Sequence, residues 1–273
     1  MKRTKIVQRL LFTVGAVIAA LYAFPFFLVL LNSVKAKRAI RNDPMGLPEE
    51  WLWENYAKAI DRMDYWVSLF NSILITVTSV TAIIIASSML AYYLARSNTK
   101  FSAVTFLVLV ASMIVPFQAL MLPFVGLFGP MVAIAAQPSL VFFYVGFGVA
   151  MSTFLYHGFI KNIPFELDEA AAIDGASPFV IFRRIIFPML SPVTATVAII
   201  NALWIWNDYL LPRLILIDTE RTLPLRTYAF YGTYTSDYGL AMAGLVISII
   251  PIVIFYFVMQ RQIIAGVSAG AVK

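Results

Sequence analysis

The stretch from Phe101 to Ile160 contains no Asp, Glu, Lys or Arg. An α-helix rises 1.5 Å per residue, so these roughly 60 residues would reach about 90 Å as one helix. The hydrocarbon core of a bilayer is only about 30 Å thick. The stretch must therefore fold back on itself, and its length without a charge is typical of a membrane protein.

The middle of this stretch carries turn signals. Proline has a fixed φ and no N–H donor, and glycine tolerates unusual backbone angles, so clusters of the two favour turns. The residues concerned are Pro123, Gly126, Gly129, Pro130 and Pro138. They predict a turn between spanning helices at about 102–125 and 138–158.

Composition extends this prediction to the whole chain. Hydrophobic residues make up 61% of the sequence and charged residues 12%, against about half and about a quarter in soluble domains. Further apolar runs long enough to cross a bilayer lie at about 10–31, 69–95, 192–216 and 239–261. We therefore expect an all-α polytopic membrane protein with six transmembrane helices in a single domain, 1–273.

Basic residues near the ends of the runs predict the orientation. Lys2, Arg3, Lys5 and Arg9 precede the first run, which is longer than the apolar core of a typical signal peptide and is expected to stay in place. The positive-inside rule puts this end in the cytoplasm, and an even number of spans puts the C-terminus there too. The segment 32–66 is then an external, partly helical loop.

Several classes of function are disfavoured by what the sequence lacks. The net charge is +6, but the basic residues mostly flank apolar runs, so no nucleic-acid partner is expected. There is no cysteine and only one histidine, which leaves no metal site. The patterns G-x-x-x-x-G-K-[ST], G-x-S-x-G and H-E-x-x-H are absent, so no catalytic residues are expected and any ATP must be bound elsewhere.

The segment 161–191 holds most of the informative polar sequence. Pro164 and the acidic residues after it suit the start of a helix, Gly175 suits its end, and Ser177-Pro178 suits the start of a second helix. Small residues, Ala170 to Ala172, allow another surface to approach this first helix closely. The pattern fits a docking helix and a solvated connector equally well.

The same segment resembles the EAA signature of permease subunits of binding-protein-dependent ABC importers. The matching pattern is Glu169-Ala170-Ala171, three residues, Gly175, nine residues, Ile185, one residue, and Phe187-Pro188, with Phe187 where the family usually has Leu. Other segments are similar to the carbohydrate-uptake class, most of all to the smaller six-span permease of maltose-type importers: Asp174-Gly175, Trp206 to Tyr209, Thr222 to Pro224, and Gln260 to Lys273.

This resemblance implies a type I ABC importer permease in a bacterial or archaeal cytoplasmic membrane. It implies a second, larger permease, an ABC ATPase dimer that binds ATP and Mg²⁺, an extracytoplasmic solute-binding protein and a sugar substrate. No cofactor is expected in this chain. The coupling residues it implies are Glu169, Ala170, Ala171, Asp174, Gly175, Ile185 and Pro188, and it implies that the tail after Gln260 reaches the ATPase. A frayed terminus is the alternative for the tail.

Polar residues in the fifth run are candidates for the translocation path. Asn201, Trp204 and Asp208 have helical spacing for one face, and Asn207 is adjacent. Amide, aromatic and carboxylate groups suit sugar hydroxyls and ring faces. The alternative is a hydrogen-bond cluster between helices with an aromatic belt, which is favoured for Trp206 and Asp208.

Other classes of transporter and enzyme remain as alternatives. An ATP-independent transporter or channel usually carries ionisable residues deep in several spans, and only Asp208 clearly qualifies here. An intramembrane hydrolase is weaker still, because His157 has no evident nucleophile partner. The loop Asp218 to Tyr238 is either the loop that touches the solute-binding protein or a plain polar surface loop.

Overall fold

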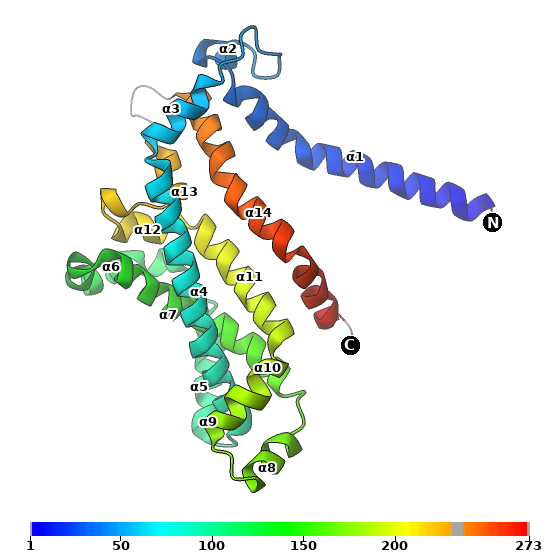
Figure 1. Ribbon diagram of the computed structural model, residues 1–273, viewed down its shortest axis with the longest axis vertical. Helices are drawn as coiled ribbons and strands as arrows, with labels where there is room; N and C mark the ends of the chain where they lie inside the picture. The colour runs from blue at the N-terminus through cyan, green and yellow to red at the C-terminus, as the bar shows by residue number, and fades with distance from the viewer. Residues whose placement is uncertain (1, 231–236, 272–273) are drawn as a thin grey trace. The chain divides into compact units, whose positions relative to one another are not determined.

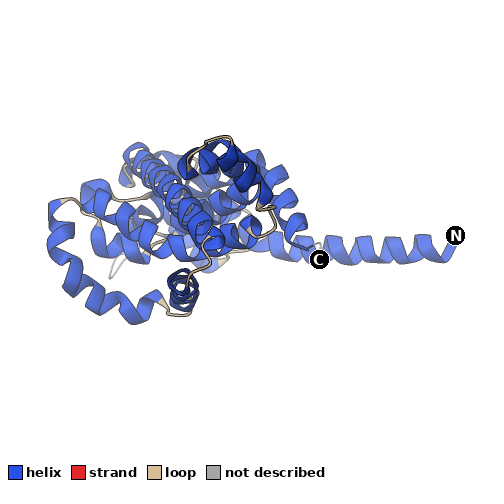
Figure 2. Ribbon diagram, turned by 90° about the horizontal axis from the view of Figure 1, so that it is seen from below, coloured by secondary structure: helices blue, strands red, loops and turns tan. Residues whose placement is uncertain are grey.

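The computed structural model describes residues 2–230 and 237–271. Within these residues every regular element is a helix, and Figure 2 shows only helices and loops. The predicted all-α fold is therefore confirmed. The chain divides into two compact units, Met1–Ser68 with Leu225–Pro251, and Leu69–Pro224 with Ile252–Lys273. The expectation of a single domain with six spans stays a prediction.

The elements are labelled in Figure 1. The first unit contains α1 (Lys2–Ser33), α2 (Lys37–Asn42), α3 (Glu54–Arg62), the 3₁₀ turn η3 (Tyr228–Phe230), and the starts of α4 (Tyr65–Arg96) and α14 (Tyr238–Ala271). The second unit contains the rest of α4, then α5 (Lys100–Ser112), α6 (Phe117–Ile134), α7 (Ala136–Ile160), α8 (Glu166–Ile173), α9 (Pro178–Ile181), the π-helical turn η1 (Phe182–Ile186), α10 (Phe187–Met189), α11 (Ser191–Asn207), α12 (Leu210–Ile215) and the 3₁₀ turn η2 (Asp218–Glu220). The short helix α13 (Leu223–Thr227) lies at the boundary.

Among the described residues, four helices are long and apolar enough to cross a membrane: α1, α4, α7 and α14 up to Gln260. Two bent pairs raise the number to six if each pair counts as one span. One pair is α5 with α6, and the other joins Pro178–Met189 to α11. In α1 the side chains from Val7 to Phe27 are all exposed, so this helix offers its apolar surface to lipid or to another subunit rather than to the described chain.

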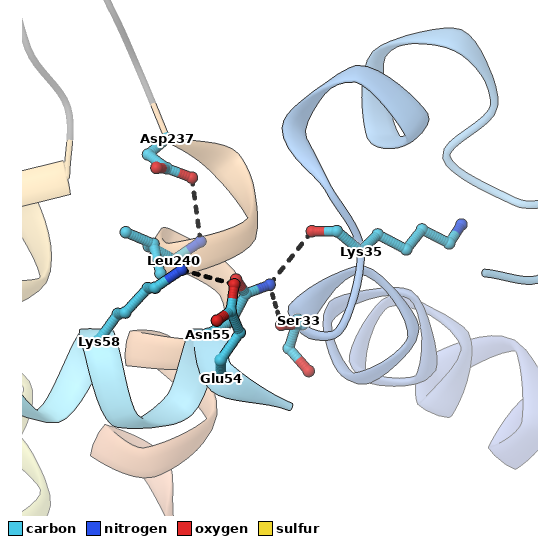
Figure 3. Close-up of polar contacts among 7 residues, drawn as sticks. All are labelled: Ser33, Lys35, Glu54, Asn55, Lys58, Asp237 and Leu240. Atoms are coloured by element: carbon cyan, nitrogen blue, oxygen red, sulfur yellow. Dashed lines mark hydrogen bonds and ion pairs between the residues drawn. The ribbon is translucent and has the colours of Figure 1, made fainter. Parts of the chain in front are cut away.

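The end of α1 is held by a buried asparagine of α3. Asn55 Nδ2 donates to the backbone oxygens of Ser33 at 2.9 Å and Lys35 at 3.2 Å (Figure 3). Gly239 lies against the same turn, since a Cβ there would come within 2.6 Å of the Lys35 oxygen. In this corner Asn55 thus satisfies two carbonyl groups that burial would otherwise leave without water.

The helix α7 is the centre of the second unit and packs against α5, α6, α11 and α12. Its contact with α11 depends on a small residue. A Cβ on Gly148 would lie 2.6 Å from Ile83 Cδ1 and 2.9 Å from Asn201 Oδ1. Any larger residue at 148 would push these two side chains aside, so glycine allows α4 and α11 to approach α7 this closely.

A break between the two expected spans is present at Ala135, but Pro123 and Pro130 lie within a helix and not in the predicted turn. The helix α6 runs through Pro123 and Pro130, while the chain bends by 104° between α5 and α6, just before Pro116, and breaks again at Ala135. Aromatic packing explains the helix: Phe124 lies 4.5 Å from Phe143 between ring centroids, and Phe128 lies 5.0 Å from it. Each proline removes one backbone hydrogen bond, and burial of these rings against α7 compensates for the loss.

The fifth apolar run is not one continuous helix. α11 ends at Asn207, and Asp208 has an extended backbone with φ −70° and ψ 134°. The Asp208 side chain accepts a hydrogen bond from the Leu210 amide at 3.1 Å, which is a turn that aspartate favours. Asp208 therefore does not share a helical face with Asn201 and Trp204, contrary to the sequence-based prediction.

We predict that Asn55→Ala destabilises the first unit, because two buried carbonyl oxygens lose their donor. The expected cost is about 1–3 kcal/mol in the free energy of unfolding, measured by thermal and denaturant unfolding of the purified chain in detergent. The matched control is Lys58→Ala on the same helix, which removes only an exposed pair with Glu54. Equal stability of the two variants would contradict this role of Asn55.

Candidate coupling site

The segment after α7 folds as the sequence predicted, into two short helices. α8 covers Glu166–Ile173 and α9 begins with Pro178 at its first position, followed by η1, α10 and α11. Within the second unit, this segment lies at the end where α4 leads into α5 (Figure 1). The π-helical turn was not predicted.

One ion pair attaches α8 to the end of α4. Asp168 Oδ2 lies 2.8 Å from Arg96 Nη2, and Asp168 Oδ1 accepts a hydrogen bond from the Tyr92 hydroxyl at 2.6 Å. Arg96 also donates to the Ile163 oxygen at 3.2 Å and lies over the Phe165 ring. The two paired side chains are 14% and 8% exposed, so the pair is largely shielded from water. Arg96 thereby holds the residues that precede α8 through Ile163 and Phe165, and it holds the first turn of α8 through Asp168.

Asp168 was not recognised from the sequence. Its position in the first turn of α8 suggested only a favourable interaction with the helix dipole. The available signal was Arg96, a basic residue at the end of an apolar run. That signal was assigned to membrane orientation instead.

Gly175 ends α8 in a left-handed conformation, with φ +82°. The Gly175 amide donates to the Ala172 oxygen and the Ala176 amide donates to the Ala171 oxygen, both at 3.0 Å. This pair of bonds is the Schellman ending of a helix, in which glycine avoids the strain of a left-handed residue. A Cβ on Gly175 would meet nothing within 4 Å. Glycine is therefore favoured at this position by its backbone conformation and not by crowding from neighbouring atoms.

The predicted coupling residues divide into two groups. Glu169, Ala170, Asp174, Gly175 and Pro188 are exposed. Ala171 is 8% exposed and belongs to a buried cluster with Ile160, and Ile185 packs against that cluster. The small size of Ala171 therefore serves the packing of α8 onto its own chain. The outward face of α8 and its approaches also carries Leu167 and Ile173, and Ile173 is 86% exposed.

The predicted path residues lie around Tyr144 of α7. The Tyr144 hydroxyl donates to Asp208 Oδ2 at 3.0 Å, and the Tyr144 ring meets Trp204 edge to face at 5.4 Å between centroids. Trp204 keeps 39% of its surface exposed. Tyr144 thus contacts both Trp204 and Asp208, although these two residues share no helical face. The sequence analysis did not identify Tyr144, because it belongs to no recognisable motif.

The amides of the other two path candidates are already used in hydrogen bonds to the helices. Asn201 is 5% exposed and its amide donates to Ser152 Oγ at 3.0 Å and to the Val197 oxygen at 2.8 Å. Asn207 is exposed and donates to the Leu203 oxygen of its own helix. Trp206 is buried. Asn201 joins α11 to α7 in the manner of a polar contact between membrane helices.

Two predicted regions are described only in part. The loop from Asp218 to Tyr238 contains residues 231–236, which lie outside the described part. The predicted tail after Gln260 is the continuation of α14 to Ala271. Its last two residues also lie outside the described part.

The fold and the loop define an all-helical, multi-pass membrane protein with an ordered helical segment between α7 and α11. The sequence model of the "binding-protein-dependent transport system inner membrane component" family matches residues 83–268. The chain belongs to this family and is a membrane subunit of such a transport system. The resemblance stated from the EAA pattern is confirmed.

Similar proteins agree with this assignment. The chain is 42% identical to the probable starch degradation products transport system permease protein of Thermoanaerobacterium thermosulfurigenes, over 100% of both chains. It is 38% identical to the multiple sugar-binding transport system permease protein of Streptococcus mutans, over 96% of this chain and 95% of that one.

A solved structure shares the fold. It is a bacterial ABC transporter involved in the import of the acidic polysaccharide alginate, and one of its chains matches with a TM-score of 0.78 at 22% identity, over 96% of this chain and 98% of that one. The expected type I ABC importer permease fold is thereby confirmed.

We predict that Asp168→Asn loosens α8, because the Arg96 guanidinium stays buried without its ionic partner. Removing one member of a buried pair costs about 3–5 kcal/mol, and the slight exposure here points to about 3 kcal/mol. Amide hydrogen exchange over 166–173 should then be about 100-fold faster. Glu169→Gln is the matched control on the exposed side of the same helix, and equal protection in both variants would refute the anchoring role.

Proposed function

We propose that this chain is a permease subunit of an ATP-driven importer of oligosaccharides. It forms half of the translocation path beside a second, larger permease. The observation that carries the proposal is an α8 held rigidly to α4 while its other face stays free. Two relatives whose names refer to starch degradation products and multiple sugars support the class of substrate.

The proposed coupling runs through α8. The ATPase would dock on the exposed face that carries Glu169, Ala170 and Ile173, with Asp174 and Gly175 at its end. Movement of the ATPase would pass to α4 through the pair of Asp168 with Arg96. It would pass to α11 through η1 and α10, because Ile185 packs in the cluster shared with Val193 and Val197. A rigid connection is needed here, because a flexible loop would not transmit a displacement of the ATPase to α4 and α11.

The chemistry of ATP belongs to the partner in this proposal. ATP and Mg²⁺ would be bound by an ABC ATPase dimer at the cytoplasmic face, because this sequence has no phosphate-binding loop with its lysine. An extracytoplasmic solute-binding protein would deliver the sugar. The family membership favours this reading over an ATP-independent transporter or channel.

The proposed contribution to the path is Trp204 with Asp208. Trp204 offers an exposed ring face held by Tyr144, and Asp208 offers a carboxylate positioned by the same tyrosine. These are the groups that stack on a sugar ring and accept its hydroxyl protons. Asn201 and Asn207 are assigned to positions beside the path, because their amides already donate to Ser152 and Val197 and to Leu203.

We predict that Ile173→Ser weakens attachment of the ATPase without changing the stability of the chain, because Ile173 is 86% exposed here. Loss of one buried isoleucine at an interface corresponds to about 1.5–3 kcal/mol, or tenfold and more in affinity. The measurement is the amount of ATPase that co-purifies with the tagged permease in mild detergent, with sugar uptake in parallel.

Leu47→Ser is the control for that experiment, since Leu47 is an equally apolar residue, 78% exposed, in the external loop. Unchanged recovery of the ATPase with Ile173→Ser would contradict docking on α8. Recovery of a stable complex without any ATPase from the native chain would contradict the importer itself.

We predict that Trp204→Ala slows uptake of starch-derived oligosaccharides while assembly stays normal. Loss of an aromatic contact is worth about 0.5–1.5 kcal/mol, which is a twofold to tenfold change in rate. Trp66→Ala is the control, because Trp66 is 70% exposed in the first unit. Equal uptake by the two variants would remove Trp204 from the path.

A further inference from the structure

A cavity of about 620 Å³ lies at the end of the second unit that also carries α8. It lies between the turn from α4 to α5 and the last turn of α7, and it is open to the surface. Its polar lining consists of Ser97, Asn98, Thr99, Lys100, Ser102, His157 and Lys161. Ser97 directly follows Arg96, whose pairing with Asp168 puts the cavity and α8 at the same end.

The cavity carries positive charge without a counter-charge. Lys100 and Lys161 both line it, and no aspartate or glutamate does among the described residues. Neither lysine forms an ion pair within the described chain. Both lysines are exposed, and their like charges make this end of the unit attractive to an anion.

The amino end of α5 opens at this cavity. Thr99 Oγ1 accepts a hydrogen bond from the Ser102 amide at 3.1 Å. The amides of Lys100 and Phe101 belong to the first turn and have no partner inside the helix. Free amides together with the helix dipole favour a bound anion.

His157 gives an independent indication of a ligand. It lines the cavity and is 6% exposed, yet neither ring nitrogen has a hydrogen-bond partner within the described residues. Its ring is fixed by stacking on Phe106, with 4.0 Å between the centroids. The imidazole therefore keeps an unused N–H donor at the cavity, and a ligand oxygen there would accept a hydrogen bond from it.

The remaining walls are apolar. Leu94, Ala95, Ala103, Phe106 and Leu107 complete the lining. Leu107 is 66% exposed, and Phe101 and Val104 beside it on α5 are 70% and 58% exposed. A ligand that places an anionic head between the lysines can therefore lay an apolar chain along α5.

We propose that this cavity binds a phosphate group, and that an anionic phospholipid of the cytoplasmic leaflet supplies it. Lys100, Lys161 and the free amides of α5 hold the phosphate oxygens, and His157 donates to one of them. The assignment to the cytoplasmic leaflet rests on the proposed function, because that function places α8 on the cytoplasmic side. The phosphate site itself does not depend on sugar transport.

The test uses the intact importer purified in mild detergent, with phosphatidylglycerol added as the probe and retention measured by native mass spectrometry. A lysine at a membrane surface contributes about fivefold to anionic-lipid binding, so Lys100→Gln with Lys161→Gln should lower retention about 25-fold. His157→Phe keeps the stacking on Phe106 and should lower retention twofold to tenfold. Lys58→Gln, at an exposed lysine of α3, is the control and should retain the lipid.

A second arm separates the sources of phosphate. Inorganic phosphate and glycerol 1-phosphate are titrated against the same proteins in ³¹P NMR. Lipid retention that depends on the two lysines and resists 10-fold excess phosphate supports the lipid. Binding of the soluble phosphates alone, again dependent on the lysines, supports the site but overturns the lipid as its source.

Equal behaviour of the native protein and the double variant toward both probes overturns the site. Co-elution of the variants with the ATPase checks their folding. Because the lipid measurement does not depend on transport, a failed importer assignment and a failed phosphate site give different results.

Discussion

The pairing of Asp168 with Arg96 is the interaction on which the second unit's docking segment depends. A helix of eight residues is too short to be stable alone in water. It persists because its first turn is tied to the end of α4 and because Ala171 packs into the cluster beneath it. The Tyr92 hydroxyl uses the second carboxylate oxygen. These contacts hold one side of α8 and leave the other side exposed.

Gly175 and the residues after it decide how the chain leaves α8. The left-handed glycine closes the last turn and brings Ala176 back onto the cluster that contains Ala171. Pro178 then starts α9, and the π-helical turn leads into α10 and α11. The signature pattern therefore combines two physical demands. Some of its residues shape the loop, and others remain outside for contact.

Local patterns predicted the loop well because its helix ends follow local rules. Gly175, Ser177 and Pro178 each act through backbone geometry within a few residues. The same kind of local signal failed at Pro123 and Pro130, where packing of Phe124 and Phe128 on α7 outweighs the turn tendency. The prediction that Asp208 lies on the same helical face as Asn201 also failed. The Asp208 side chain accepts a hydrogen bond from the Leu210 amide, and α11 ends before it.

Contacts between distant residues could not be predicted from local patterns. Asp168 with Arg96 and Tyr144 with Asp208 are separated by 72 and 64 positions. The residues that flank each of these four positions in the sequence do not indicate which distant residue it contacts. The long apolar runs did predict the class of fold, because hydrophobic length is itself a physical requirement for crossing a bilayer.

The central claim is that the outward face of α8 meets the ATPase, and a cysteine crosslink tests it most directly. The chain has no cysteine, so a single Ile173→Cys substitution supplies one reactive thiol. Membranes containing the whole importer are treated with a thiol-to-amine crosslinker, and Leu47→Cys serves as an exposed control. The account predicts a covalent adduct with the ATPase from Ile173→Cys alone. A thiol at 173 that reacts with a small reagent but never joins the ATPase would contradict it.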